Sequence, residues 1–192
     1  MYLLHWLQSG TLVLGLGGLV QALSRWAIWI GALGAAAIFL LAPRRAEKLR
    51  RGAFYGLLAG VLALALAHSL AGAFVRPRPA AQDGTLIRAL LPLPQSSSFP
   101  ARASAFLFAL AGGLFTGGED AGVLAVLFGL LAALAEMAAG LAFPTDEIGG
   151  VLLGLSAAWA VLLAQGLFER PLRWLLRYGG WASSNPRRRA GR

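Results

Sequence analysis

The sequence has no cysteine, only two histidines and little charge. Without cysteine, disulfides, thiol nucleophiles and cysteine-ligated zinc or iron–sulfur sites are excluded. Charged residues make up 13% of the chain, against about 25% in an ordinary soluble domain. Apolar residues take their place: 58% of the 192 residues are hydrophobic, more than a soluble core of this length can bury. We therefore expect an integral membrane protein without a separate soluble domain.

Apolar runs of membrane-spanning length recur along the chain, separated by short polar breaks. A spanning helix needs about 20 apolar residues. Runs near that length occupy residues 26–42, 52–75, 100–115, 121–141 and 147–168. We expect an all-α bundle of five transmembrane helices over residues 26–168.

The two ends of the chain are expected to lie at the membrane surface. Residues 1–25 are long enough for a sixth span, but the glycines over 15–18 also suit an interfacial or re-entrant segment. Residues 169–192 carry arginines among tryptophans and leucines. We expect them to form a basic amphipathic tail whose first part, 169–181, lies as a helix on the anionic inner leaflet.

A proline-rich loop separates the second and third spans. Arg76-Pro77-Arg78-Pro79 ends the second span, and its two prolines disfavour further helix. A short apolar segment over 86–91 is predicted to form a helical turn on the surface.

Basic residues dominate the charge and predict the orientation in the membrane. The chain has 17 Lys and Arg against 8 Asp and Glu, a net charge of +9. With five spans, twelve of the 17 fall on one side, in the cluster over 44–51 and in the tail. The positive-inside rule then predicts a multi-pass protein of the cell (inner) membrane with a cytoplasmic C-terminus and with the loops over 76–98 and 143–147 outside. The basic blocks flank apolar segments, and no stacking aromatics interleave a basic groove, so we expect no nucleic-acid partner.

Polar side chains near the outer ends of the spans are the candidate site residues, because burying them in a membrane is costly. Arg76, Arg78 and Arg102 carry guanidinium groups that suit a phosphate. The other candidate site residues are His68, Ser69, Glu136, Asp146 and Glu147. We expect a cationic pocket for an anionic lipid headgroup; the alternative is that the arginines reach bulk headgroups and each acid pairs with one of them. No metal-ligand motif or phosphate-cradling glycine loop occurs, so we expect neither a metal nor a cofactor.

Glycines at helical spacing mark two surfaces of close packing. Gly52, Gly56 and Gly60 share one face of the second span, and Gly150 and Gly154 share one face of the fifth. Such spacing lets helices approach closely. The pattern is consistent with packing inside the bundle and equally with a homodimer contact.

Three segments between Gly52 and Gly154 form a recognisable set. They are Arg76-Pro77-Arg78-Pro79, then Ser98-Phe99-Pro100 with Ala103-Ser104-Ala105-Phe106, and then Phe143-Pro144-Thr145-Asp146-Glu147-Ile148-Gly149-Gly150. In order and position the set resembles the motifs of the type-2 phosphatidic acid phosphatase (lipid phosphate phosphatase) family, most nearly its small bacterial polyprenyl-diphosphate phosphatase branch. The resemblance implies a helical bundle with lipid-phosphatase topology.

Most catalytic positions of that family are changed in this chain. Counted along the motifs, the nucleophilic histidine falls on Ala142, and the histidine that protonates the leaving oxygen falls on Ala103. Other catalytic positions fall on Ser69, Ala101, Arg102, Ala135 and Glu136. Arg76 and Asp146 remain as the first-motif arginine and the third-motif aspartate. Because alanine can neither attack phosphorus nor donate a proton, the motifs predict the fold without the family's catalysis.

The sequence therefore predicts a catalytically inactive lipid-phosphatase-like protein. We expect it to bind an anionic lipid headgroup or to serve as a structural or regulatory subunit of a membrane complex. Two alternatives stay open: an active lipid phosphate or polyprenyl diphosphate phosphatase in which His68 replaces a lost histidine, and a lipid or small-anion transporter that uses Glu136. Expected partners are a membrane lipid and either another membrane protein or a second copy of the chain.

Arg102 and Glu136 have opposite charges at positions expected to share the pocket. An unpaired charge near the bilayer core costs several kcal/mol, so we expect the two side chains to pair. The alternative is that Glu136 pairs with Arg76 or holds a proton.

Overall fold

The structure is a computed structural model that describes residues 2–43, 46–82 and 89–178. These residues form helices and no strand, which confirms the predicted all-α class. The helices are α1 (Tyr2–Val13), α2 (Gly17–Leu41), α3 (Glu47–Ala73), α4 (Pro79–Gln82), α5 (Arg102–Phe115), α6 (Glu119–Ala138), α7 (Pro144–Leu163) and α8 (Gln165–Tyr178).

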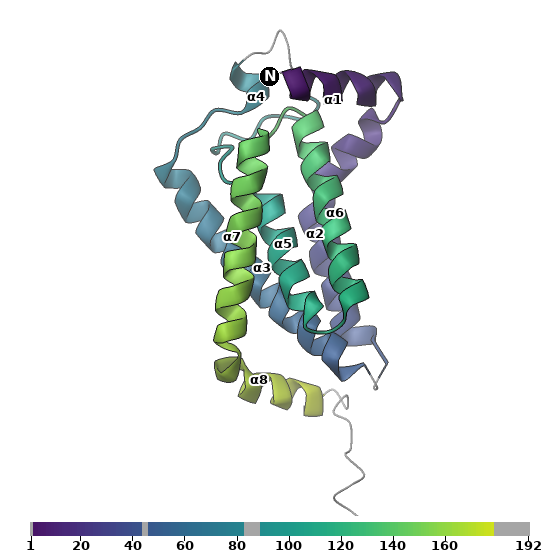
Figure 1. Cartoon of the computed structure of the whole chain (residues 1–192), viewed down its shortest axis with the longest axis vertical. Helices are drawn as coiled ribbons and strands as arrows, with labels where there is room; N and C mark the ends of the chain where they lie inside the picture. Colours follow the sequence, from purple (N-terminus) through teal and green to yellow (C-terminus); the bar gives the residue numbers. More distant parts are fainter. Residues whose placement is uncertain (1, 44–45, 83–88, 179–192) are drawn as a thin grey trace, which may run out of the picture.

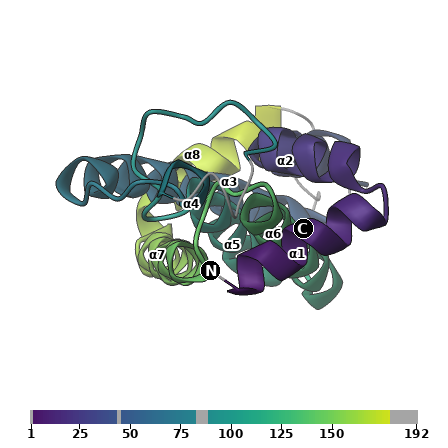
Figure 2. The ribbon, with the colours of Figure 1, turned by 90° about the horizontal axis from the view of Figure 1, so that it is seen from above.

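Helix α5 lies at the centre of the bundle, in contact with α2, α3, α6 and α7 (Figures 1 and 2). The four outer helices are long and apolar enough to cross a membrane. At 14 residues, α5 is only about 21 Å long at 1.5 Å per residue, short of the hydrocarbon thickness of about 30 Å. Because protein encloses it, a shorter helix leaves no backbone end exposed to lipid. All five predicted spans are helices, and four have spanning length.

The N-terminal region differs from its predicted boundaries. Helix α2 begins at Gly17, nine residues before the predicted start at Trp26. The chain turns at Gly15, whose φ of 67° is a backbone conformation that glycine adopts readily. Helix α1 therefore forms a separate segment that lies across one end of the bundle (Figure 1), where the Nε2 of buried Gln8 donates a hydrogen bond to the Ala138 carbonyl at 3.1 Å.

The proline-rich loop also departs from expectation. Helix α4 begins at the second of the two prolines, Pro79. At that position the missing N–H has no intrahelical partner to lose, so proline is well tolerated there. Residues 86–88 of the helical turn predicted over 86–91 lie outside the described residues, and residues 89–91 are not helical.

The two glycine stripes pack inside the bundle, against α5. A Cβ atom added at Gly113 of α5 would lie 2.1 Å from the Gly56 nitrogen of α3. A Cβ at Gly154 of α7 would lie 2.4 Å from the Ala105 carbonyl oxygen of α5, and one at Gly150 would lie 2.4 Å from the carbonyl oxygen of Ala101, the residue that precedes α5. Internal packing thus accounts for both stripes, and these faces are not free to form a dimer contact.

The crossing of α3 and α5 gives a direct test of this packing. We expect Gly113→Ala to lower the free energy of unfolding by about 1–3 kcal/mol, because the new methyl group forces two backbones apart. Gly72→Ala on α3 is the matched control, since a Cβ there meets nothing within 4 Å. Thermal denaturation in detergent measures both, and equal melting temperatures for the two variants would contradict the crossing geometry.

Helix α8 lies across the other end of the bundle (Figure 1). It begins at Gln165, four residues before the predicted start of the tail, and accommodates Pro171 within it. Leu172 and Leu176 are buried in the core. Its Glu169 accepts hydrogen bonds from Arg51 at 2.9 Å and from the Tyr55 hydroxyl at 3.0 Å, which hold α8 against α3.

Candidate functional site

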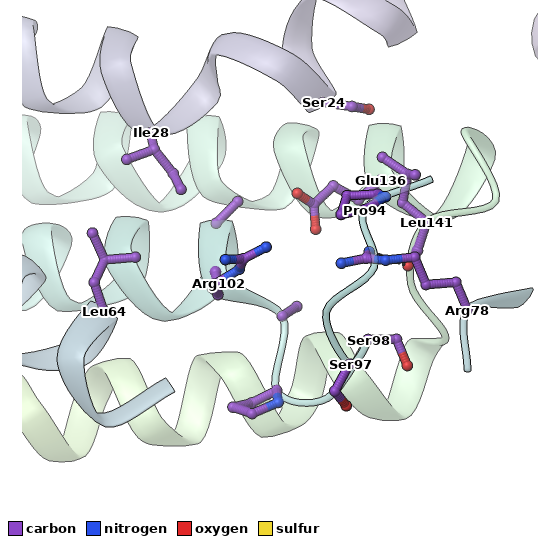
Figure 3. Close-up of a pocket in the computed structure, with 13 residues that line it drawn as sticks. Ser24, Ile28, Leu64, Arg78, Pro94, Ser97, Ser98, Arg102, Glu136 and Leu141 are labelled. Atoms are coloured by element: carbon purple, nitrogen blue, oxygen red, sulfur yellow. Dashed lines mark hydrogen bonds between the residues drawn. The ribbon is translucent and has the colours of Figure 1, made fainter. Parts of the chain in front are cut away.

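A cavity of about 250 Å³ lies at the α1 end of the bundle, between the ends of the helices and the loop before α5 (Figure 3). Its polar lining includes Ser24 of α2, Arg78, Ser98, Arg102 of α5 and Glu136 of α6. Residues from four separate segments therefore meet here. The cavity brings together three of the predicted site residues: Arg78, Arg102 and Glu136.

Two arginines point into this cavity from opposite sides (Figure 3). Arg78 donates one hydrogen bond to the Leu141 carbonyl at 2.7 Å and a long one to the Ser96 hydroxyl at 3.5 Å. Arg102 donates to the same Ser96 oxygen at 3.0 Å. Neither guanidinium forms an ion pair with any described residue. Both cations thus retain donors for an anion, and Ser96 holds them near each other.

The Arg78 guanidinium is partly desolvated. Burial lowers its pKa, and the Glu136 carboxylate is the strongest charge that opposes this effect. Arg102 acts in the same direction as burial, since a second cation disfavours the charged form of the first. A bound anion would relieve the repulsion between the two arginines.

Glu136 points into the same cavity but does not pair as predicted (Figure 3). Among the described residues, no ion pair joins it to Arg102. Arg102 bonds to Ser96 instead, and Arg78 has the stronger electrostatic influence on Glu136. The predicted ion pair between Arg102 and Glu136 is therefore wrong. Arg78, Arg102 and Glu136 line the same cavity, and no salt bridge joins these three described residues.

Arg76 and Asp146 form a separate ion pair beside the cavity. Arg76 Nη1 lies 2.6 Å from Asp146 Oδ1 and donates a further hydrogen bond to Thr145 at 2.7 Å. The guanidinium also lies 4.3 Å from the centre of the Phe143 ring. Asp146 is fully buried, and its Oδ2 accepts a hydrogen bond from the Phe143 N–H at 2.9 Å. Oδ2 therefore caps the N-terminus of α7, and Oδ1 ties this helix to the loop after α3.

The structure does not bring His68 and Ser69 to the cavity. Both side chains are exposed on α3, and the Ser69 hydroxyl donates to the Ala65 carbonyl of its own helix. Helix α3 packs closely on α5 near Gly56 but diverges from it toward its end. Leu64, one helical turn before His68, does line the cavity, and Ala67 is buried in the core. The side chains of His68 and Ser69 are on the exposed side of α3, so the predicted pocket lacks them.

A buried contact between Ser104 and Glu147 joins α5 to α7 near the cavity. The Ser104 hydroxyl donates a hydrogen bond to Glu147 Oε2, and both residues are buried. Glu147 was expected among the polar residues at the outer end of its span, whereas Ser104 was not singled out. The sequence feature that could have indicated Ser104 is its hydroxyl group within a helix that is apolar after Arg102.

The two alanines that the resemblance places at the family's histidine positions, Ala103 and Ala142, lie at this end of the bundle. Ala103 lines the cavity beside Arg102. Ala142 is buried next to Leu141, another cavity residue. No described residue that lines the cavity is a histidine.

Comparison with known proteins bears on this arrangement. Neither a family model nor a curated protein sequence matches the chain. Among solved structures, LpxE of Aquifex aeolicus, a lipid phosphatase of the PAP2 superfamily, superposes with a TM-score of 0.64 at 25% identity, over 84% of this chain and 93% of that one. The fold is PAP2-like. This chain is thus a membrane protein with a lipid-phosphatase-like architecture, as the three motifs predicted.

Proposed function

We propose that this PAP2-like protein is catalytically inactive and binds the anionic headgroup of a membrane lipid in the Arg78–Arg102 cavity. One observation carries the proposal: two guanidinium groups point into one cavity, and neither is neutralised by an ion pair with a described residue. Guanidinium forks match the oxygens of a phosphate group. Ala103 and Ala142 support the loss of catalysis, because they stand where the family has its two histidines.

The charge balance of the cavity favours an anion. Arg78 and Arg102 supply two positive charges, and Glu136 supplies one carboxyl group. Ser96 already bonds both arginines with its hydroxyl oxygen. A phosphate oxygen could take the same donors with a full negative charge, which makes each hydrogen bond stronger.

Loss of either arginine should weaken headgroup binding. We expect Arg78→Gln and Arg102→Gln each to lower the affinity for phosphatidic acid in mixed micelles by roughly 10- to 100-fold, since a hydrogen bond to a charged group contributes about 1.5–3 kcal/mol. Arg170→Gln, at the exposed surface of α8 on the other end of the bundle, is the matched control. Isothermal titration measures the affinities.

Two outcomes of that titration would count against the proposal. Unchanged affinity in both cavity variants would show that the lipid binds elsewhere. An equal loss in the Arg170→Gln control would show that binding follows net charge and not the cavity. Competition by inorganic phosphate separates a site for free phosphate from one that needs the lipid.

The proposed orientation places the cavity outside and helix α8 at the cytoplasmic face. Its basis is the excess of lysine and arginine in the cluster over 44–51 and in the C-terminal tail, which five spans place on one side of the membrane. Because the chain has no cysteine, Ala46→Cys and Gln82→Cys each create a unique label near opposite ends of α3. In intact cells, an impermeant maleimide should label the Gln82 variant and spare the Ala46 variant. Labelling of Ala46→Cys alone would reverse the orientation.

A further inference from the structure

A second hollow lies between α2 and α6, on the surface of α5. We call it the α2–α6 groove. It has a volume of about 240 Å³ and an apolar lining, which includes Gly34 and Ile38 of α2, Leu110 and Leu114 of α5, and Phe128 of α6. Helices α2 and α6 are both long and apolar enough to span the membrane. The groove therefore opens toward the hydrocarbon layer.

The groove lies next to the headgroup cavity along α2 and α5. On α2, Ile28 lines the cavity and Gly31 lines the groove; on α5, Ala103 lines the cavity and Leu107 lines the groove. These spacings of three and four residues correspond to about one helical turn. The groove thus begins about one turn from the cavity, toward the centre of the bundle.

The dimensions of the groove suit a flexible chain. From Ile30 to Ile38 it runs along α2 for about 12 Å at 1.5 Å per residue. An α-helix with its side chains is about 10–12 Å wide, too wide for a hollow of this volume. In the wall formed by α2, Gly34 leaves open space, since a Cβ there would meet nothing within 4 Å.

We infer that the α2–α6 groove holds the hydrocarbon chain of the same lipid whose anionic headgroup binds at Arg78 and Arg102. The inference rests on the proposed function and adds a second binding site on the same lipid, for its hydrocarbon chain. The polar cavity suits the headgroup of such a lipid, and the neighbouring apolar groove suits its hydrocarbon chain. Burial of the chain against Gly34 and Phe128 contributes affinity that the headgroup alone lacks.

Filling the groove tests the inference. Gly34→Leu adds an apolar side chain to the groove wall at a position where a Cβ meets nothing within 4 Å, and Ala125→Leu adds one from α6 if the first variant folds poorly. We expect either variant to lower the affinity for oleoyl lysophosphatidic acid by about tenfold or more. Binding of glycerol phosphate, the same headgroup without a chain, should not change. Gly18→Leu on the same helix, also in open space, is the matched control.

The outcomes separate this inference from the proposed function. If Arg78→Gln weakens both ligands while Gly34→Leu weakens neither, the headgroup site stands and the groove assignment falls. If Arg78→Gln weakens neither ligand, the proposed function itself falls. If Gly34→Leu instead dissociates a dimer and leaves lipid affinity unchanged, the groove is an interface between two copies and the inference is overturned.

Discussion

The purified protein is expected to release no phosphate from phosphatidic acid or from a polyprenyl diphosphate. Ala142 and Ala103 stand where the resemblance places the nucleophile and the acid, and neither side chain can form a bond to phosphorus or transfer a proton. Removing a member of such a cooperative unit lowers kcat on the order of 10⁶-fold. A malachite green assay in detergent, with Aquifex aeolicus LpxE and its own substrate as the positive control, measures the release.

The opposite result would revive the alternative of an active phosphatase with a divergent mechanism. That mechanism needs a substitute nucleophile, and His68 is the candidate that the sequence offers near the cavity end of the bundle. The structure leaves His68 exposed on α3, outside the cavity lining. Phosphate release above the detergent blank that disappears in His68→Ala would refute the inactive interpretation, whereas release that survives in His68→Ala and in Asp146→Asn would indicate a contaminating enzyme.

The sequence predicted the bundle well because apolar run length is a local property. Helices α3, α6 and α7 lie on predicted spans, with ends within a few residues of the predicted ones. Helix α5 was also expected from its apolar run. Its central place was not, because a run of apolar residues looks the same whether lipid or protein surrounds it. The glycine stripes contained that information, but equally allowed a dimer.

The sequence was less informative about where a glycine turns the chain and about which face of a helix meets its neighbours. The glycines over 15–18 suggested a break, yet only Gly15 turns the chain, and Gly17 begins α2. His68 and Ser69 were assigned to the pocket because they lie near the end of a span. Both side chains are exposed on α3 instead, because the face that a helix presents to its neighbours depends on packing contacts along the whole helix.

At the candidate site, sequence reasoning predicted the shared location of charges better than their partners. Arg78, Arg102 and Glu136 were expected at one end of the bundle, and they line one cavity. The choice of Ser96 as the partner of Arg102 depends on the path of the loop before α5. That path is set by tertiary contacts, which spacing along the chain does not encode.

The ion pair of Arg76 and Asp146 is expected to be a major source of stability at this end of the fold. Asp146 is fully buried, and Arg76 lies 2.6 Å from it. Breaking a buried pair leaves an uncompensated charge, which costs about 3–5 kcal/mol. Because water reaches the half-exposed Arg76, we expect Arg76→Gln to lower the free energy of unfolding by about 3 kcal/mol. Thermal denaturation in detergent measures the loss.

A double-mutant cycle distinguishes the ion pair from general damage. In Arg76→Gln with Asp146→Asn no charge stays buried, so the double variant should be more stable than the sum of the single effects predicts. Arg173→Gln is the control, since its contact with Glu169 on α8 is 3.9 Å long and exposed, and such pairs contribute about 0–1 kcal/mol. Strict additivity would show that the two residues act independently. Coupling, together with an absence of phosphatase activity, would explain why this chain holds Arg76 and Asp146 without the histidines: the pair fastens α7 to the loop after α3 and so shapes the wall of the cavity.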